Sequence, residues 1–239
     1  LPPKLLELKA SSITGSEGDA VNTWSDTSGQ SNDASSSLFP ASRYSDSPVL
    51  VKHTDSQGHQ HQLVRFGCGT SCTSGSPTWD KYTPLQTSQY VFSTQSAGLE
   101  AWVVVRQPDT GNVQHDTCPN DSVDGCFLFN QGQYGYPTRS GQKEYRGFGL
   151  TYSSARVWGY LPGPTGAVSG ILADDSATTT LTRALTIVRM RVEFGSEGKL
   201  QLDQNGQEVS SVDADSPGLD TSTMWESTGN QRCCGPFMV

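Results

Sequence analysis

Apolar and polar residues alternate along several short stretches of this chain, and a period of two is typical of β-strands. The clearest stretch covers residues 99–106. One of its faces carries Leu99, Ala101, Val103 and Val105, and the other carries Glu100, Trp102, Val104 and Arg106. Because both faces are largely apolar near the middle, this segment is predicted to be a central strand of a sandwich.

The same alternation recurs over residues 185–194, where large apolar residues are interleaved with Thr and Arg. Residues 195–198 predict a hairpin turn, 199–203 the returning strand, and 208–212 a third strand after Asn205-Gly206, the strongest short hairpin signal. Further strands are predicted at 5–9, 49–52, 62–66, 89–93, 126–130, 145–152, 156–160 and 166–172. Short strands joined by turns, without an apolar period of helix length, predict an all-β antiparallel sandwich or barrel.

The composition supports a folded chain rich in turns. Only 33% of the 239 residues are hydrophobic, and 25 Gly and 13 Pro are spread along the sequence. Five Trp, eight Tyr and eight Phe are more than a disordered chain usually carries. The sequence shows no internal repeat and no linker long enough to divide it, so residues 1–239 are predicted to form a single domain.

The charge of the chain argues against two classes of partner. A net charge of −8 and a pI near 4.9 disfavour binding to nucleic acid or to an anionic membrane surface. No apolar run approaches the roughly 20 residues that cross a bilayer, so no membrane span is predicted. The sequence begins at Leu1 without a Met or an apolar leader, so any secretion signal is expected to have been removed or to lie outside it.

Cysteines and a glycosylation motif indicate an oxidising compartment. The six cysteines lie in three close pairs, Cys68 with Cys72, Cys118 with Cys126, and Cys233 with Cys234. Their connectivity stays open, although bridges that close the first two short loops are the simplest arrangement. Asn120 begins an Asn-Asp-Ser glycosylation motif inside the second loop. Together these features predict a secreted, disulfide-containing glycoprotein.

Four landmarks in sequence order resemble those of a known family. They are residues 8–12, 18–21 and 24–34 with Trp24-Ser25-Asp26-Thr27-Ser28-Gly29, then Leu63-Val64-Arg65-Phe66-Gly67, then 101–105, and last the 198–209 hairpin. In these landmarks the chain resembles the laminin-G-type jelly rolls of the concanavalin A-like lectin and glucanase superfamily. The resemblance covers nearly the whole chain and implies an antiparallel two-sheet jelly-roll sandwich.

The end of the sequence departs from the pattern of this family. Such domains usually close with another apolar strand after a segment like 234–239, where this sequence stops. A domain that lacks its closing strand has an open sheet edge, and open edges pair with neighbouring chains. This edge and the Cys233–Cys234 pair are therefore the features through which self-assembly is predicted. The alternatives are a strand supplied elsewhere in a longer protein, or residues 237–239 as the stub of that strand.

The resemblance also implies a calcium ion, because laminin-G-type domains often hold one at the rim of the sandwich. Calcium takes hard oxygen ligands. The candidate ligands are Asp26, Asp33, Asp174, Asp175 and Asp203. Plain Asx turns are the alternative role for each of these residues.

Aromatic residues in polar loops are the candidates for ligand binding. A sugar would stack on an exposed ring of Trp79, Tyr82, Tyr134, Tyr136 or Trp225. Packing of these rings beneath their loops is an equally open alternative. Trp24, Trp102 and Trp158 lie in strand-like sequence and are predicted to belong to the core.

Catalytic and zinc-binding patterns are weak in this sequence. Glycosidases need paired carboxylates that face one cleft, and Asp213 and Asp215, which do have strand spacing, lie in a segment that is expected to be a loop. Three histidines at 53, 59 and 61 precede Cys68 and Cys72, but their spacing matches no common zinc module.

The sequence therefore predicts a non-catalytic extracellular module rather than an enzyme. Its expected partner is a glycan or an extracellular protein, and a structural subunit of a surface assembly or fibre belongs to the same hypothesis. The alternative is a polysaccharide hydrolase or lyase of the same fold. Both hypotheses rest on fold resemblance, and one fold hosts many functions.

Overall fold

The computed structural model describes residues 4–38, 47–66, 85–92, 98–106, 126–131, 136–137, 143–144, 148–153, 156–161, 179–180, 184–195 and 197–213. These residues form β-strands, two short 3₁₀ helices and no α-helix, and the paired strands are antiparallel. The prediction of a β-rich antiparallel chain is confirmed. The chain divides into two compact units, Leu1–Val91 with Pro236–Val239 and Phe92–Gly235. The single domain over residues 1–239 stays a prediction.

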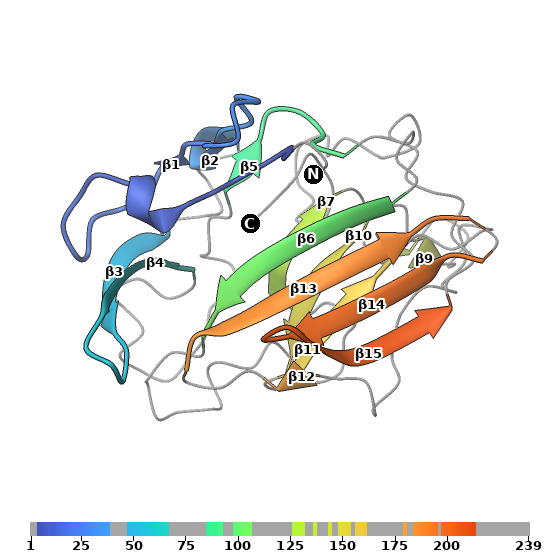
Figure 1. Ribbon diagram of the computed structural model, residues 1–239. Coiled ribbons are helices and arrows are strands. Elements are labelled where there is room, and N and C mark those ends of the chain that lie inside the picture. The colour runs from blue at the N-terminus through green and yellow to red at the C-terminus, as the bar shows by residue number, and fades with distance from the viewer. Residues whose placement is uncertain are drawn as a thin grey trace. The chain divides into compact units, whose positions relative to one another are not determined.

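The first unit contains two small sheets and the 3₁₀ helices η1 (Ala10–Ser12) and η2 (Ser36–Leu38) (Figure 1). One sheet has the order β1 (Thr23–Trp24), β2 (Ala34–Ser35), β5 (Gln86–Thr87), and the other is the hairpin of β3 (Val49–Thr54) and β4 (Gln60–Arg65). The strand predicted at 5–9 is reduced to a single bridge between Leu8 and Asp26. Residues 89–92 of the segment predicted at 89–93 lie outside strands.

Trp24 anchors the core of this first unit. It is buried together with Val21, Ala34, Leu50 and Leu85. Its ring also stacks on that of Phe66, with centroids 6.5 Å apart. The prediction that Trp24 is a core residue is confirmed, because its side chain is 9% exposed and packs in this cluster.

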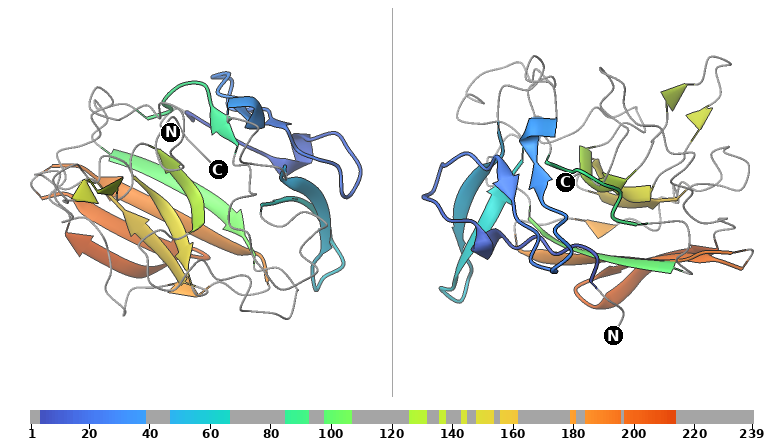
Figure 2. Two further views of the ribbon diagram at one scale, coloured as in Figure 1. Left: turned by 180° about the vertical axis from the view of Figure 1, so that it is seen from behind. Right: turned by 90° about the horizontal axis from the view of Figure 1, so that it is seen from above.

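The second unit contains the longer strands and two four-stranded sheets. Its strands are β6 (Gly98–Val105), β7 (Cys126–Gln131), β8 (Tyr136–Pro137), β9 (Lys143–Glu144), β10 (Phe148–Ser153), β11 (Arg156–Tyr160), β12 (Thr179–Thr180), β13 (Thr186–Glu193), β14 (Lys199–Gln204) and β15 (Gln207–Asp213). The sheet orders are β12-β11-β10-β7 and β15-β14-β13-β6, and β8 pairs with β9. The left view of Figure 2 shows the first of these sheets from behind.

The β13–β14–β15 meander follows the sequence prediction closely. Asn205 and Gly206 have φ angles of 51° and 84°, as a type I′ turn between β14 and β15 requires. Asn205 also binds the backbone of Ile187 on β13, since its N–H donates to the Ile187 oxygen at 2.8 Å and its Oδ1 accepts the Ile187 N–H at 2.9 Å. Asn205, which follows β14 in the turn, is therefore also hydrogen-bonded to the beginning of β13.

The buried side chains of the second unit come from both four-stranded sheets. Those on β13 and β14 are Val188, Met190, Val192, Leu200 and Leu202, and those on β7, β10 and β11 include Phe129, Phe148, Leu150 and Val157. The two groups of side chains come close at Gly159 on β11, because a Cβ added there would lie 3.2 Å from Leu202 Cδ2 and 3.4 Å from Met190 Sδ. A side chain at position 159 would therefore require Leu202 or Met190 to shift by a few tenths of an ångström.

Candidate functional site

A large aromatic side chain stands exposed on the sheet of the second unit. Trp102 on β6 is 57% exposed, so the prediction that it belongs to the core is wrong. Leu99 is buried, and the strand alternates, which turns Glu100, Trp102 and Val104 to the outer face. Among the described strands, β6 stands at one end of its sheet order. A strand with one solvated face tolerates the apolar residues that had suggested burial on both sides.

Neighbours on two strands hold the Trp102 ring in place. Its indole Nε1–H donates to Glu100 Oε1 at 2.6 Å, two residues away on the same face of β6. Arg189 is the residue directly opposite Trp102 on β13. The guanidinium carbon of Arg189 lies 5.2 Å from the centroid of the indole ring, within the range of a cation–π contact. The aromatic group is therefore oriented while most of it remains exposed.

Arg189 connects Trp102 to a buried carboxylate on the third strand. Asp203 on β14 lies opposite Arg189, and the two side chains form an ion pair. Glu100 Oε2 lies 3.8 Å from the same guanidinium. Asp203 is 2% exposed, and its Oδ1 accepts a hydrogen bond from Gln201 Nε2 at 2.8 Å. The row Trp102–Arg189–Asp203 thus crosses three strands, with its aromatic end in solvent.

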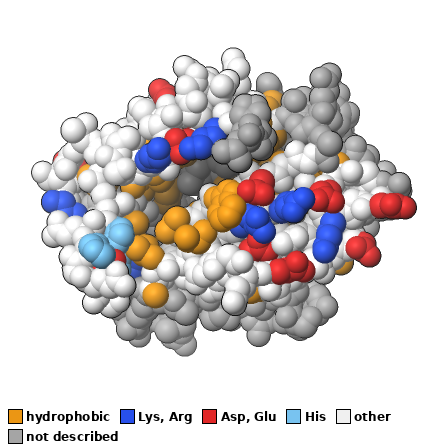
Figure 3. All heavy atoms as spheres, viewed as in Figure 1, with side chains coloured by type: hydrophobic (Ala, Val, Ile, Leu, Met, Phe, Trp, Pro, Cys, Tyr) orange, Lys and Arg blue, Asp and Glu red, His pale blue; other side chains and the backbone are white. Residues whose placement is uncertain are grey.

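We call the outward-facing side chains of β6, β13 and β14 the Trp102 face. They are Glu100, Trp102, Val104, Ile187, Arg189, Arg191, Glu193, Lys199, Gln201 and Asp203. Figure 3 shows hydrophobic side chains on the molecule's surface next to intermixed basic and acidic ones. Val104 and Ile187 are opposite each other in the register and are 56% and 42% exposed. The face therefore combines an aromatic ring, a short apolar strip and a polar ladder.

One feature of the sequence indicates that this face is solvated. Residues 100 and 106 are charged and share a face with Trp102, and the 185–194 strand carries two arginines on one face. A face with that many charges is solvated. The register that places Arg189 opposite Trp102 needs the pairing of β6 with β13, which lie more than 80 residues apart in the chain.

The aromatic residues predicted to bind ligand lie elsewhere in the chain. Trp79, Tyr82, Tyr134 and Trp225 lie outside the described residues, and of Tyr136 only the backbone in β8 is described. The same holds for the glycosylation site Asn120 and for the cysteines. Cys68, Cys72, Cys118, Cys233 and Cys234 lie outside the described residues, and only the backbone of Cys126 in β7 is described. These predictions stay predictions.

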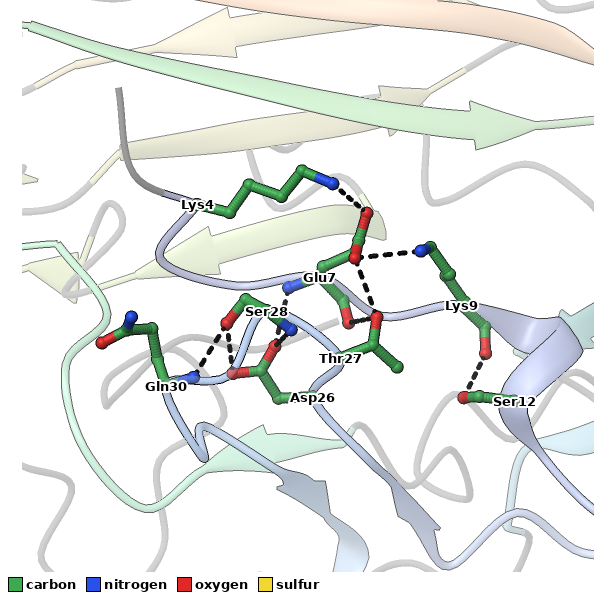
Figure 4. Close-up of polar contacts among 8 residues, drawn as sticks. All are labelled: Lys4, Glu7, Lys9, Ser12, Asp26, Thr27, Ser28 and Gln30. Carbon is green, nitrogen blue, oxygen red and sulfur yellow. Dashed lines mark hydrogen bonds and ion pairs between the residues drawn. The ribbon is translucent and has the colours of Figure 1, made fainter. Parts of the chain in front are cut away.

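The structure shows how the predicted calcium ligand Asp26 is used in the first unit (Figure 4). Its Oδ1 accepts the N–H groups of Glu7 and Ser28 at 2.9 and 2.8 Å. Its Oδ2 accepts the Ser28 hydroxyl at 2.8 Å and the Asn32 N–H at 3.0 Å. Asp33 lies beside it and accepts the Asp26 N–H at 2.8 Å. Both oxygens of Asp26 thus close the polar loop that follows Trp24.

Partial burial by itself raises the pKa of Asp26, but the N–H groups of Ser28, Glu7 and Asn32 outweigh it and leave the pKa below its ordinary value. Of the other candidate ligands, Asp203 belongs to the second unit, and Asp174 and Asp175 lie outside the described residues. Within the described part of the chain, no group of three or more His, Cys, Asp or Glu side chains is arranged to hold a metal. Calcium stays a prediction.

Glu7 supplies a test of the electrostatics of this loop. Its carboxylate contacts Lys4, Lys9 and Thr27, chiefly the Lys4 ammonium group, and these contacts lower its pKa from 4.5 to about 2. A depressed folded-state pKa contributes stability that is present above pH 4.5 and is lost as the pH falls toward about 2. The urea midpoint of the wild type is therefore expected to exceed that of Glu7→Gln near neutral pH and to approach it as the pH falls through this window. A gap that is the same at every pH would contradict the assignment.

A second polar cluster lies at the β3–β4 hairpin. There, two of the three histidines considered for zinc binding contact one carboxylate, that of Asp55. Asp55 Oδ2 lies 2.9 Å from His61 Nε2 and 3.2 Å from His59 Nδ1. Its Oδ1 accepts the N–H groups of Gln57 and His59, each at 2.9 Å. The His61 contact, followed by the His59 N–H, holds the pKa of Asp55 well below its ordinary value. These bonds close the turn of the hairpin.

Comparison with protein-family models, with curated proteins and with solved structures found no match for this chain. The resemblance to laminin-G-type domains therefore stays a prediction from the residues quoted above. None of the described residues forms a helix long and apolar enough to cross a membrane.

Proposed function

We propose that this chain is a non-catalytic extracellular recognition module that binds a glycan on the Trp102 face. The single observation that carries the proposal is the exposed Trp102 ring, oriented by Glu100 and Arg189. Sugar rings present a C–H-rich face that packs on an aromatic ring and a rim of hydroxyl groups that bond to polar side chains. The Trp102 face offers both kinds of contact side by side.

For the fold, we propose that the two four-stranded sheets of the second unit form the sandwich of a jelly roll. The closeness of β11 to β13 and β14 at Gly159, where an added Cβ would meet Leu202 and Met190, supports this arrangement, since sheets in a sandwich bury their inner side chains against each other. The cysteine pairs and the glycosylation motif at Asn120 support a secreted, extracellular location.

The structure brings two carboxylates close together, but their geometry gives little support to the alternative, a polysaccharide hydrolase. Glu100 and Asp203, on different strands, both contact Arg189. A catalytic carboxylate must reach the bond that is cleaved, and Asp203 is 2% exposed beneath Arg189. Asp213 ends β15, and Asp215 lies outside the described residues. Binding without turnover is therefore the function that the Trp102 face supports better.

A glycan array followed by calorimetry tests the proposal. Trp102→Ala is expected to weaken binding of the selected glycan at least about tenfold, because a central exposed aromatic group commonly dominates such a surface. Trp102→Phe keeps a ring but loses the Glu100 hydrogen bond, so its affinity is expected to fall between those of the wild type and Trp102→Ala.

Val212→Ala on β15 is the matched control, because it removes an exposed apolar side chain from the same sheet away from the ring. Its affinity is expected to equal that of the wild type. Affinities are measured below the unfolding midpoint of every variant, so that a loss of binding is not a loss of folding. Absence of glycan binding, or equal affinity of the wild type and Trp102→Ala, would refute the proposal. New reducing or unsaturated sugar ends that disappear in Glu100→Gln would support the hydrolase instead.

A further inference from the structure

The charges of the Trp102 face carry one inference that deepens, and rests on, the proposed function. Among the described side chains of this face, both arginines form ion pairs, and the lysine stands opposite a glutamate in the register. Arg189 pairs with Asp203 and Glu100. Arg191 Nη2 lies 2.8 Å from Glu193 Oε1, and Lys199 stands opposite Glu193 in the register.

We infer that the ligand of the Trp102 face is an uncharged glycan chain rather than a sulfated or uronic-acid polymer. An anionic group seated on the Trp102 ring needs a cation that can turn to it, and Arg189, the cation in contact with that ring, would have to leave the buried Asp203 carboxylate to do so. Arg191, the next cation along β13, lies opposite Glu100 in the register and pairs with Glu193. A buried carboxylate without its partner is strongly unfavourable. The net charge of −8 on the chain adds a repulsion at longer range.

The carboxylates disfavour a cationic ligand by the same reasoning. Glu100 already accepts the indole N–H and contacts Arg189, and Asp203 is covered. Paired charges still bond to hydroxyl groups, because a hydroxyl both donates to a carboxylate and accepts from a guanidinium. A sugar without net charge therefore uses the polar ladder without breaking any ion pair.

The shape of the face favours a chain of sugars over a single one. Val104 follows Trp102 by two residues on β6, which corresponds to about 6–7 Å along a strand. Ile187 lies opposite Val104 and widens this apolar strip. One sugar ring on Trp102 would place the next ring of a linear chain over Val104 and Ile187.

Calorimetry with paired ligands tests the inference on the full chain. The uncharged arms are oligosaccharides of β-glucan, mannan and xylan, and the anionic arms are sulfated and uronic-acid oligosaccharides of matched length. Each is titrated at about 50 and 500 mM NaCl, concentrations that differ about threefold in screening length. An uncharged oligosaccharide is expected to bind best, with an affinity that changes less than about twofold with salt, and lengthening it from one sugar to three should strengthen binding.

Trp102→Ala separates the inference from the proposed function. An anionic ligand that binds best, depends on Trp102 and weakens about tenfold or more in high salt would overturn the inference and leave the proposed function standing. Binding of an uncharged chain that survives Trp102→Ala would overturn both. Absence of binding to every oligosaccharide tested would also overturn both the inference and the proposed function.

Discussion

Leu202→Ala is expected to lower the free energy of unfolding of the Phe92–Gly235 unit by about 2–5 kcal/mol. Leu202 is 1% exposed, and its Cδ2 is the atom nearest to the position of a Cβ at Gly159. Truncation to alanine removes apolar contacts and leaves a cavity between β14 and β11. Urea unfolding followed by tryptophan fluorescence measures the change, with the exposed Val104→Ala as a control that should stay within about 0.5 kcal/mol of the wild type.

The opposite substitution tests whether the two sheets face each other at this point. Gly159→Val alone is expected to destabilise by about 1–3 kcal/mol, because the added methyl groups meet Leu202 and Met190. In the Leu202→Ala background the same valine would fill the vacated space, so the double variant should be more stable than the sum of the two losses predicts. Strictly additive losses would contradict the proposed sandwich packing.

Asp26→Ala is the second change expected to have a large effect, about 2–3 kcal/mol on the Leu1–Val91 unit. The substitution leaves the N–H groups of Glu7, Ser28 and Asn32 without their acceptor. Part of the loss is recovered by water, because the site is only half-buried. Hydrogen exchange of these three amides should rise together with the loss of stability.

Asp26→Asn is the matched variant for this loop. It keeps one carbonyl acceptor in nearly the same shape and should cost less than half as much as alanine, with slower exchange for the amides that still bind it. Asp33→Ala removes a single acceptor, that of the Asp26 N–H, and should lie closer to the wild type. Equal losses for Asp26→Asn and Asp26→Ala would show that the hydrogen bonds to the second oxygen, rather than the shared acceptor, organise the loop.

Several parts of the fold were accessible from local patterns. The 195–198 turn is present, with the Gly198 N–H donating to the Gly195 oxygen at 3.0 Å. Asn205-Gly206 forms the predicted hairpin turn between β14 and β15. Strands at 49–54, 126–131, 156–160 and 186–193 confirm the predicted ones to within a few residues. Such features depend on neighbours in sequence, so a single sequence carries them.

The candidate site was not accessible in this way. Trp102 was predicted to be buried, because an apolar run on both faces of a strand is also the pattern of a central strand. Carboxylate spacing along one strand does not reveal Glu100 and Asp203, which meet at Arg189 from strands far apart in the sequence. The residues were visible in the sequence, but the strand register that brings them together was not.

The sequence by itself determined that this chain is β-rich and antiparallel, where its tightest turns lie, and that Trp24 is buried, because backbone preferences and alternation act over a few residues. Only the tertiary structure decided that Trp102 faces solvent, that Arg189 stands between it and Asp203, and that Asp26 serves the loop at Glu7. These outcomes depend on which strands and loops pair across long separations, and that choice is made by the burial and hydrogen bonding of the whole chain rather than by any segment alone.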